Sequence, residues 1–438
     1  MRAFKDKLRQ TWQLVYQNRH STIGKNIVAL YLLEFANYIM PLVTIPYVTR
    51  VLGIANYGAV AFVQSLTIYL VMLTEYGFNL SATREIARQR DDPEAINRIA
   101  GQVWGAKVVL GLCSLFVLGL AWYLLPRLQE VSLLIVIMSG ILLGSILFPT
   151  WLFQGLERIT TISIINLITR LLAIAAIFIL VRGPQDRNLY AASLAVQWIA
   201  AGLIAVLLAY YQLGLRPRRP SWQQIRQELT SGWVLFLSRG AAMTYVTANA
   251  FILGLLTNDA AVGYYSAAEK VVRAVLRLNS TISQAVYPRF SMRAHQSKER
   301  TLLWAGRLLL AMVALGLLTS GALFLSAPLL SRLLVGEDWQ PVVSVMRMLA
   351  ILPLINGITT VFAVQILLPF GHDRPFLNSR LAGGLVNLAV ALLLAPIFFQ
   401  TGMAIAVICA EISVGLVLTT ALLRRGLFPL PAAKSPPQ

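Results

Sequence analysis

The chain has 438 residues, of which 57% are apolar and only 13% are charged, and its mean hydropathy is +0.69. Because a soluble domain usually carries about 25% charged residues, this composition excludes an ordinary water-soluble protein and indicates an all-α integral membrane protein. The net charge of +19 is dispersed over segments between apolar runs, so we expect contact with anionic membrane lipids and no nucleic-acid partner.

Residues 1–25 form a basic N-terminal segment, and the apolar run that follows lacks the cleavage site of a signal peptide. Apolar runs of about 20 residues, long enough to cross a bilayer, then recur along the chain. They predict about twelve transmembrane helices, at residues 27–47, 57–78, 104–124, 131–152, 161–181, 190–211, 231–256, 263–287, 303–324, 341–366, 376–398 and 402–423.

The loops between these spans alternate in charge. With a cytoplasmic N-terminus, 23 Lys and Arg residues lie in inner segments and 5 in outer loops, which is the positive-inside pattern. We therefore expect both termini in the cytoplasm. A basic cytoplasmic linker, residues 212–230, would separate an N-terminal six-helix bundle (26–211) from a C-terminal one (231–425), and residues 426–438 would form a cytoplasmic tail.

The two expected bundles would both start on the inner side, so an internal repeat would be parallel. A faint echo supports such a repeat. Val51-Leu52-Gly53 through Asn56-Tyr57-Gly58 follows the first span, and Leu255-Leu256 through Val262-Gly263-Tyr264-Tyr265 follows the seventh.

Nine cations fall inside the expected spans. Four of them lie close enough to a span end to reach the headgroups, and we interpret them as interfacial anchors: Lys107, Arg307, Arg347 and Arg380. The other five lie deeper: Arg170, Arg239, Lys270, Arg273 and Arg277.

The span 263–287 carries a polar stripe. At 100° per residue, its polar side chains share an arc of about 80°; they are Ser266, Lys270, Arg273, Arg277, Ser280 and Gln284. An Arg or Lys facing lipid at the bilayer centre costs about 2.5–3.5 kcal/mol, so the stripe is expected to face protein or water. Glu269, one turn before Arg273, would partly neutralise it.

Two alternatives remain for this stripe. The segment could lie flat on the membrane, but then the charge bias of every later loop would invert. The arginines could instead pair with acids such as Glu34 or Glu411, although deep cations outnumber deep acids. We expect an excess of positive charge, joined by Arg239 and Arg170, that binds phosphate or pyrophosphate.

The first span combines an acid with two prolines. Glu34, Asn37 and Pro41 share one helical face, and Pro41 leaves the carbonyl of Asn37 without its helical donor. Pro46 repeats the break, so Pro41 and Pro46 are candidate hinges. Glu34 and Asn37 are candidates for binding a coupling H⁺ or Na⁺, with Glu411 as a further candidate; static pairing of Glu34 with an Arg is an equal alternative.

Signals of enzymatic chemistry are poor. The three histidines lack metal-ligand spacing, no Gly-rich phosphate-binding loop occurs, and both cysteines lie inside apolar runs. We expect no enzyme activity, no catalytic residue, no metal and no cofactor.

Three groups of motifs share their order and spacing with a known family. The first is Tyr57-Gly58 with TEYGFNLSATREIA over 74–87, the second is PTWLFQGLER over 149–158, and the third is VGYYSAAEK over 262–270 with AVYPRF over 285–290. Together they resemble the bacterial O-antigen and polysaccharide flippases of the Wzx type, within the multidrug/oligosaccharidyl-lipid/polysaccharide exporter superfamily.

This resemblance implies two six-helix bundles around a central cavity. It further implies a flippase of the bacterial inner (plasma) membrane that moves undecaprenyl-pyrophosphate-linked oligosaccharides to the outer leaflet by alternating access coupled to an ion gradient. Other proteins of polysaccharide assembly would be its partners. The family's cationic cavity would correspond here to Arg239, Lys270, Arg273 and Arg277, with Arg170.

Two other functions were weighed. Multidrug efflux by the same superfamily would need an acidic cavity for cationic drugs, whereas this stripe is positive. A membrane-embedded oligosaccharide polymerase or glycosyltransferase would usually carry large catalytic loops. The outer loops of this chain are short.

Overall fold

The computed structural model describes residues 40, 42–230, 232–233, 236, 248–294 and 296–429. Within these residues all regular elements are helical. Eight of the described helices are long and apolar enough to cross a membrane. The expected number of twelve remains a prediction, because most of the first and seventh expected spans lie outside the described residues. Four expected site residues also lie outside them: Glu34, Asn37, Pro41 and Arg239.

Contacts divide the described chain into two compact units. The first holds Tyr69–Val181 and Asn188–Phe236, and the second holds Leu42–Ile68, Arg182–Arg187 and the described residues from Ala248 onward. Leu42–Ile68, which we expected in the first bundle, therefore groups with the C-terminal half of the chain.

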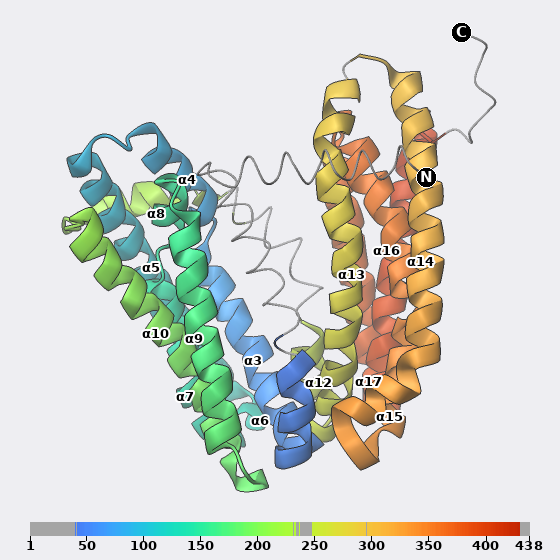
Figure 1. Ribbon diagram of the computed structural model, residues 1–438, viewed down its shortest axis with the longest axis horizontal. Coiled ribbons are helices and arrows are strands. Elements are labelled where there is room, and N and C mark those ends of the chain that lie inside the picture. Colours follow the sequence, from blue (N-terminus) through green and yellow to red (C-terminus); the bar gives the residue numbers. More distant parts are fainter. Residues whose placement is uncertain are drawn as a thin grey trace, which may run out of the picture. The chain divides into compact units, whose positions relative to one another are not determined.

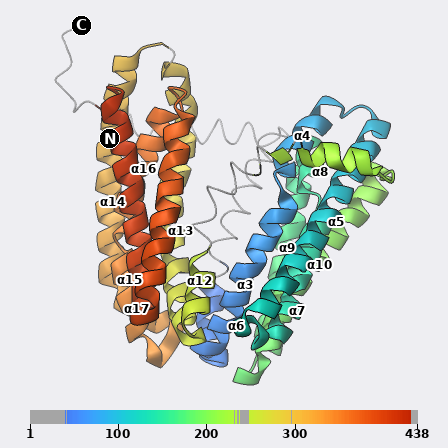
Figure 2. The same cartoon turned by 180° about the vertical axis from the view of Figure 1, so that it is seen from behind.

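The first unit contains the end of α3, the helices α4 to α10 (Figures 1 and 2) and a helix over residues 222–230. The labelled helices are α3 (Ile54–Glu75), α4 (Phe78–Arg88), α5 (Pro93–Leu124), α6 (Pro126–Gln129), α7 (Ser132–Leu147), α8 (Thr150–Gly155), α9 (Ile159–Leu180) and α10 (Arg187–Leu213).

Two of the family-like motifs pack together in this unit. α4, from the motif over 74–87, lies against α8, from the motif over 149–158. The Thr83 hydroxyl donates to the carbonyl of Trp151 (3.2 Å), and a Cβ added at Gly155 would lie 2.7 Å from Ile86. Trp151 and Ile86 are fully buried. The motifs are therefore a packing element of the first unit's core.

The expected linker is attached to α5. The backbone N–H groups of Arg216 and Arg218 donate to the Asn97 side chain (2.6 Å) and carbonyl (3.2 Å), and the Arg218 guanidinium pairs with Glu94 at 3.1 Å. A helix over residues 222–230 follows. This segment thus groups with the first unit.

The second unit begins with a short helix over Leu42–Leu52 and the first turns of α3. It continues with η2 (Pro184–Asp186), α12 (Asn249–Leu256), α13 (Asp259–Ala294), α14 (Lys298–Val335), η3 (Gly336–Asp338), α15 (Gln340–Leu349), α16 (Leu352–Thr360), the π-helix η4 (Val361–Leu367) and α17 (Asp373–Arg424). α17 is broken at Phe399, whose φ is 51°. The break falls between the expected spans 376–398 and 402–423.

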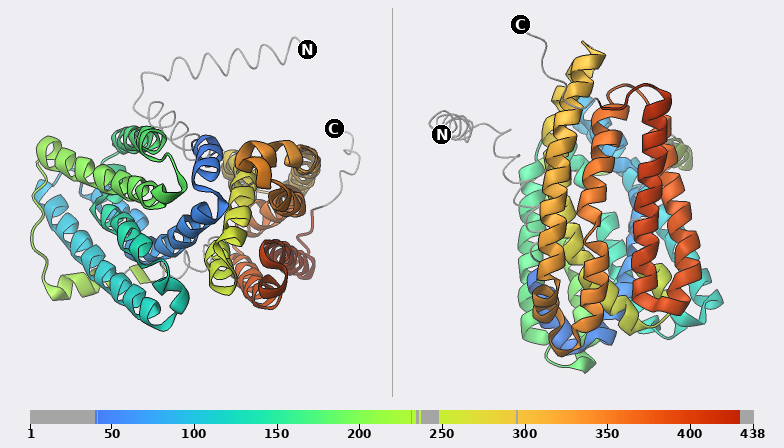
Figure 3. Two further views of the ribbon diagram at one scale, coloured as in Figure 1. Left: turned by 90° about the horizontal axis from the view of Figure 1, so that it is seen from below. Right: turned by 90° about the vertical axis from the view of Figure 1, so that its right-hand side faces the viewer.

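The charged segment 263–287 lies within α13, a single helix of 36 residues that is about 54 Å long. α13 packs on α14, α15 and α16, and it runs alongside α14 in Figure 1 and in the side view of Figure 3. α14 is one of the membrane-length apolar helices. This packing favours a crossing helix over one that lies flat on the surface.

Two glycines explain why the start of α3 belongs to the second unit. A Cβ added at Gly58 would lie 1.8 Å from the carbonyl oxygen of Asp259, and one added at Gly263 would lie 2.3 Å from that of Ile54. Gly58 thus contacts the residue four positions before Gly263, and Gly263 contacts the residue four positions before Gly58. Such a reciprocal contact is isologous. The sequence echo between 56–58 and 262–265 therefore coincides with a local two-fold relation between two helix starts in direct contact.

Candidate functional site on α13

Lys270 carries a positive charge in the second unit, where its side chain is partly buried. Its Nζ lies 5.2 Å from the ring centroid of Tyr57, which is fully buried, so the ammonium gains a cation–π contact. Among the residues that the structure describes, no carboxylate forms an ion pair with Lys270. Its charge is therefore available to an anion.

Arg273 has an acidic partner on its own helix. Its guanidinium lies 2.8 Å from Glu269 Oε1, with side-chain exposures of 33% and 17%. The Tyr265 hydroxyl donates to the same oxygen at 3.0 Å. The expected partial neutralisation of the stripe by Glu269 is confirmed. The alternative of a static ion pair therefore fits Arg273 better than it fits Lys270 or Arg277.

A hollow of about 70 Å³ lies beside this pair. It is lined by Asn249, Tyr265, Glu269, Arg273 and Glu411, together with apolar side chains. This volume has room for a few water molecules. Glu411, a candidate for ion coupling, thus comes together with Arg273, a candidate for substrate binding. The sequence offered Glu411 as one possible partner of the stripe's arginines, but it did not indicate which arginine lies near it.

The C-terminal half of α13 has an exposed polar face. Arg277, Thr281 and Gln284 are all exposed and lie within about 60° of one another on the helix. Such side chains are unfavourable against lipid, so they favour an aqueous environment.

The opposite face of α13 is held by buried hydrogen bonds. Asn279 donates to the carbonyl of Pro353 at 2.9 Å. The Gln365 amide donates to the carbonyl (2.9 Å) and the hydroxyl (2.7 Å) of Ser283. All three polar side chains are at most 3% exposed. α16 and η4 therefore fix the direction in which the charged face of α13 points.

Two expected companions of the stripe cannot be placed beside it. Arg170 lies on α9, partly buried, in the first unit, and Arg239 lies outside the described residues. Their contribution to the site remains a prediction. Pro46 lies inside the helix over Leu42–Leu52, and its hinge role also remains a prediction.

Lys107 is not an interfacial anchor, contrary to our expectation. It is 0% exposed, and its Nζ lies 2.9 Å from Glu75 Oε1 and 2.7 Å from the carbonyl of Ser145. α5 begins at Pro93, so Lys107 lies about four turns inside the helix. Sequence reasoning did not single out Glu75 as its partner, although both residues lie near the inner ends of consecutive spans.

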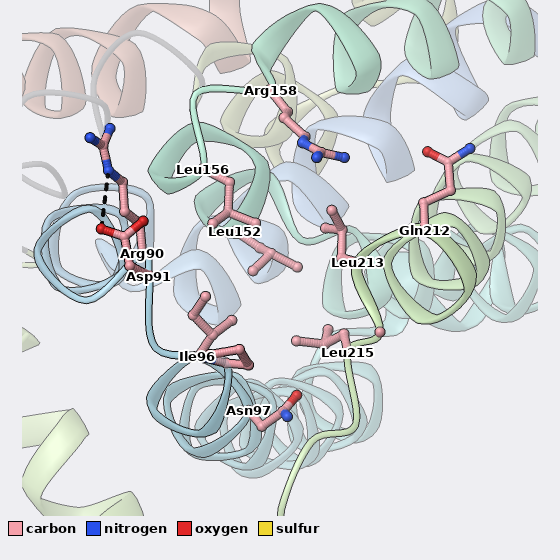
Figure 4. A pocket seen from close by; sticks show the side chains of 12 residues that line it. Arg90, Asp91, Ile96, Asn97, Leu152, Leu156, Arg158, Gln212, Leu213 and Leu215 are labelled. Atoms are coloured by element: carbon pink, nitrogen blue, oxygen red, sulfur yellow. Dashed lines mark ion pairs between the residues drawn. The ribbon is translucent and has the colours of Figure 1, made fainter.

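Another hollow, of about 360 Å³, lies in the first unit and is larger than the one beside Arg273 (Figure 4). Arg90, Asp91, Asn97 and Arg158 line it together with leucines from α8 and α10 and the residues after them. Arg90 lies 3.9 Å from Asp91 and 3.6 Å from Glu157. Because acids contact Arg90, this hollow presents less free positive charge than α13.

Solved structures identify the class of fold. The chain is similar to the lipid II flippase MurJ in an inward closed conformation, with a TM-score of 0.71 and 12% identity over 90% of this chain and 87% of that one. It is also similar to an inward-facing multidrug resistance MATE family transporter of the MOP superfamily, with a TM-score of 0.60 and 12% identity over 90% and 99% of the two chains. These likenesses show the fold of the chain, and its membrane-length apolar helices agree with a multi-pass membrane protein.

Comparison with protein sequences identifies the family of the chain. Residues 23–294 match the family described as "Polysaccharide biosynthesis protein", and the chain belongs to that family. Two relatives are each named "Putative O-antigen transporter". The one from Escherichia coli K12 is 28% identical over 89% of this chain and 94% of the relative; the one from Shigella dysenteriae is 29% identical over 91% and 99%. The resemblance inferred from the motifs is confirmed.

Proposed function

We propose that this protein flips undecaprenyl-pyrophosphate-linked oligosaccharides, the repeat units of a surface polysaccharide, from the inner to the outer leaflet of the inner membrane. Its family, the names of its O-antigen transporter relatives and its MurJ-like fold support this function. The observation that carries the proposal is the cationic α13, where Lys270 forms no ion pair with a carboxylate of the described residues and Arg277 is exposed on a polar face.

In this proposal, α13 captures the pyrophosphate. Arginine binds phosphate through two parallel hydrogen bonds and lysine binds it as a point charge. Arg277 and Lys270 would hold the headgroup, and Arg239 and Arg170 would complete the site from other helices. The sugar would occupy an aqueous space beside the polar face of α13 while the prenyl chain stays in lipid. Bending at Pro41 and Pro46 would accompany alternating access.

We assign ion coupling to the hollow beside Arg273. Glu269 and Glu411 both line it, so two carboxylates share one guanidinium group in a small hollow with few water molecules. Protonation of one acid would balance the charge and let Arg273 remain with the other. A fixed cation disfavours Na⁺ at this position, so H⁺ is the proposed coupling ion and Glu411 its acceptor. Glu34 and Asn37 would be the alternative site.

We further propose that the protein transports its substrate without chemical conversion. Its relatives are named as transporters, and the positive stripe opposes recognition of cationic drugs. The partners would be the lipid-linked substrate, membrane lipids and other proteins of polysaccharide assembly.

The capture step is tested with the double variant Lys270→Gln/Arg277→Gln. Surface polysaccharide is expected to be lost while lipid-linked units accumulate on the cytoplasmic side and the variant remains folded in the membrane. Arg84→Gln/Arg88→Gln removes two exposed cations from α4 and serves as the matched control. Normal export by the α13 variant would contradict the proposal.

The coupling step is tested in proteoliposomes with Glu411→Gln. Flipping by the unmodified protein should respond to an imposed pH gradient, and the variant should retain only passive exchange. If the pH response survives, Glu411 is not the acceptor. If flipping responds to a Na⁺ gradient instead, the choice of H⁺ is wrong.

A further inference from the structure

A pocket of about 250 Å³ opens between the end of α13 and the beginning of α14. It is far along α13 from the stripe at Lys270 to Arg277. Three arginines contribute to its wall, and the other lining side chains are apolar; the full lining is Val286, Arg289, Phe290, Arg293, Trp304, Arg307 and Leu308. The wall of the pocket therefore combines three cationic side chains with four apolar ones.

The positive charge of this pocket has no acidic counterpart among the described residues. None of the ion pairs that join described residues involves Arg289, Arg293 or Arg307. The Arg293 guanidinium lies 3.8 Å from the ring centroid of Trp304, which orients it without neutralising it. Three guanidinium groups around one hollow repel each other, so an anion that enters the hollow is favoured.

Two features predict that the pocket lies at the depth of the lipid headgroups. The charge bias of the loops predicts a cytoplasmic loop between α13 and α14, and Trp304 is of the residue type that is enriched at the interface. Three exposed leucines of α14 lie within about 40° of Arg307 on the helical wheel: Leu318, Leu325 and Leu329, which are 70%, 79% and 63% exposed. An apolar surface for acyl chains thus extends from the pocket along α14.

We propose that this pocket binds the phosphate headgroup of an anionic glycerophospholipid of the inner leaflet, cardiolipin or phosphatidylglycerol. The arginines would bind the phosphate oxygens, and the acyl chains would lie along the exposed leucines of α14. Basic pockets between transmembrane helices on the cytoplasmic side suit such headgroups. Because the arginines come from both helices, the lipid would fasten the end of α13 to the start of α14. This inference does not depend on the proposed transport function.

Native mass spectrometry of the delipidated full-length protein tests the proposal. Cardiolipin and phosphatidylglycerol are expected to bind in preference to phosphatidylethanolamine. The variant Arg289→Gln/Arg293→Gln/Arg307→Gln should lower cardiolipin affinity roughly a hundredfold, from the usual contribution of each cation at an anionic surface. Arg84→Gln/Arg88→Gln/Arg98→Gln removes the same charge from exposed positions in the first unit and should leave the affinity unchanged.

Two further variants keep the test decisive. Replacing the three arginines by lysine retains the charge and should retain part of the affinity. Arg307 is exposed, so Arg307→Glu should preserve packing while it removes the preference for cardiolipin. Equal cardiolipin binding by the unmodified protein and the glutamine variant would overturn the proposal. Displacement of cardiolipin by undecaprenyl pyrophosphate at equal concentration would also overturn it, since the pocket would then belong to the prenyl carrier.

Discussion

Lys107 and Glu75 form a buried ion pair between α5 and α3, with 2.9 Å between Nζ and Oε1. The Lys107 side chain is 0% exposed and that of Glu75 is 27% exposed. Asn79 donates to the other carboxylate oxygen at 2.9 Å, and Lys107 also donates to the carbonyl of Ser145 on α7. One ammonium group therefore connects three helices of the first unit.

Breaking this pair should be costly. Lys107→Met leaves the Glu75 carboxylate without its cation and should destabilise the first unit by about 3 kcal/mol, because removing one partner leaves a charge uncompensated. Thermal unfolding in detergent measures the effect. Lys107→Met/Glu75→Gln should recover most of the loss. If the single and double variants melt together, the pair does not stabilise the unit.

The contact between Gly58 and Gly263 should not accept a side chain. Gly58→Ala places a methyl group against the backbone of Asp259. Through overpacking, it should lower the free energy of unfolding by about 1–3 kcal/mol. Gly321→Ala on α14 meets no atom within 4 Å and should instead add about 0.5–1 kcal/mol. The two melting temperatures should move in opposite directions. A shared upward shift would refute the close approach.

Water access to α13 can be measured by cysteine labelling. In a background of Cys113→Ser/Cys409→Ala, Gln284→Cys is expected to react quickly with a membrane-impermeant maleimide, because the thiolate forms only in a polar environment. Leu325→Cys is also exposed but faces the apolar side of α14, and Ser283→Cys is buried. Both should react slowly. Equal rates at residues 284 and 325 would rule out a distinct aqueous face.

The segment over residues 222–230 should respond to pH. Burial, with a smaller contribution from the nearby Glu85 carboxylate, raises the pKa of Glu228 to about 7. A glutamate in the unfolded chain has a pKa of about 4.3. The folded state therefore binds the proton more tightly, and its stabilisation is complete below about pH 4.3 and is lost as the pH rises through about 7.

Glu228→Gln should remove this dependence. The melting temperature of the unmodified protein in detergent should fall between pH 5 and pH 8, and the decrease should be smaller in the variant. Glu85→Gln should weaken the dependence only in part, because burial is the larger cause. An identical decrease in all three proteins would show that another group titrates.

The sequence predicts those features that depend on local periodicity. A repeat of polar residues at helical spacing predicts α13 and its charged face, and the Glu269–Arg273 contact follows from their separation by one turn. The gap between two apolar runs predicts the break at Phe399. These relations need no knowledge of how helices pack.

Features that depend on tertiary packing could not be predicted in this way. The burial of Lys107 was missed because the apolar run that marked its span begins near residue 104, whereas the helix begins at Pro93, where the Asp92 side chain caps its first turn. The approach of Glu411 to Arg273 depends on how α17 packs against α13. The repeat between 56–58 and 262–265 was visible in the sequence, but their contact was not.

Because of the π-helix η4, the direction of the charged face of α13 depends on the number of residues in the segment 361–367. A π-turn contains an additional residue compared with an α-turn, and Gln365, which binds Ser283, lies within it. Deletion of one residue from 361–367 would let the segment rewind as a regular α-helix. Side chains beyond the deletion would then turn by about 100° relative to those before it, and the amide that holds Ser283 would point elsewhere. Together with the Asn279–Pro353 hydrogen bond to α16, an irregular helical segment without a charged residue thus sets the angular position of Lys270 and Arg277.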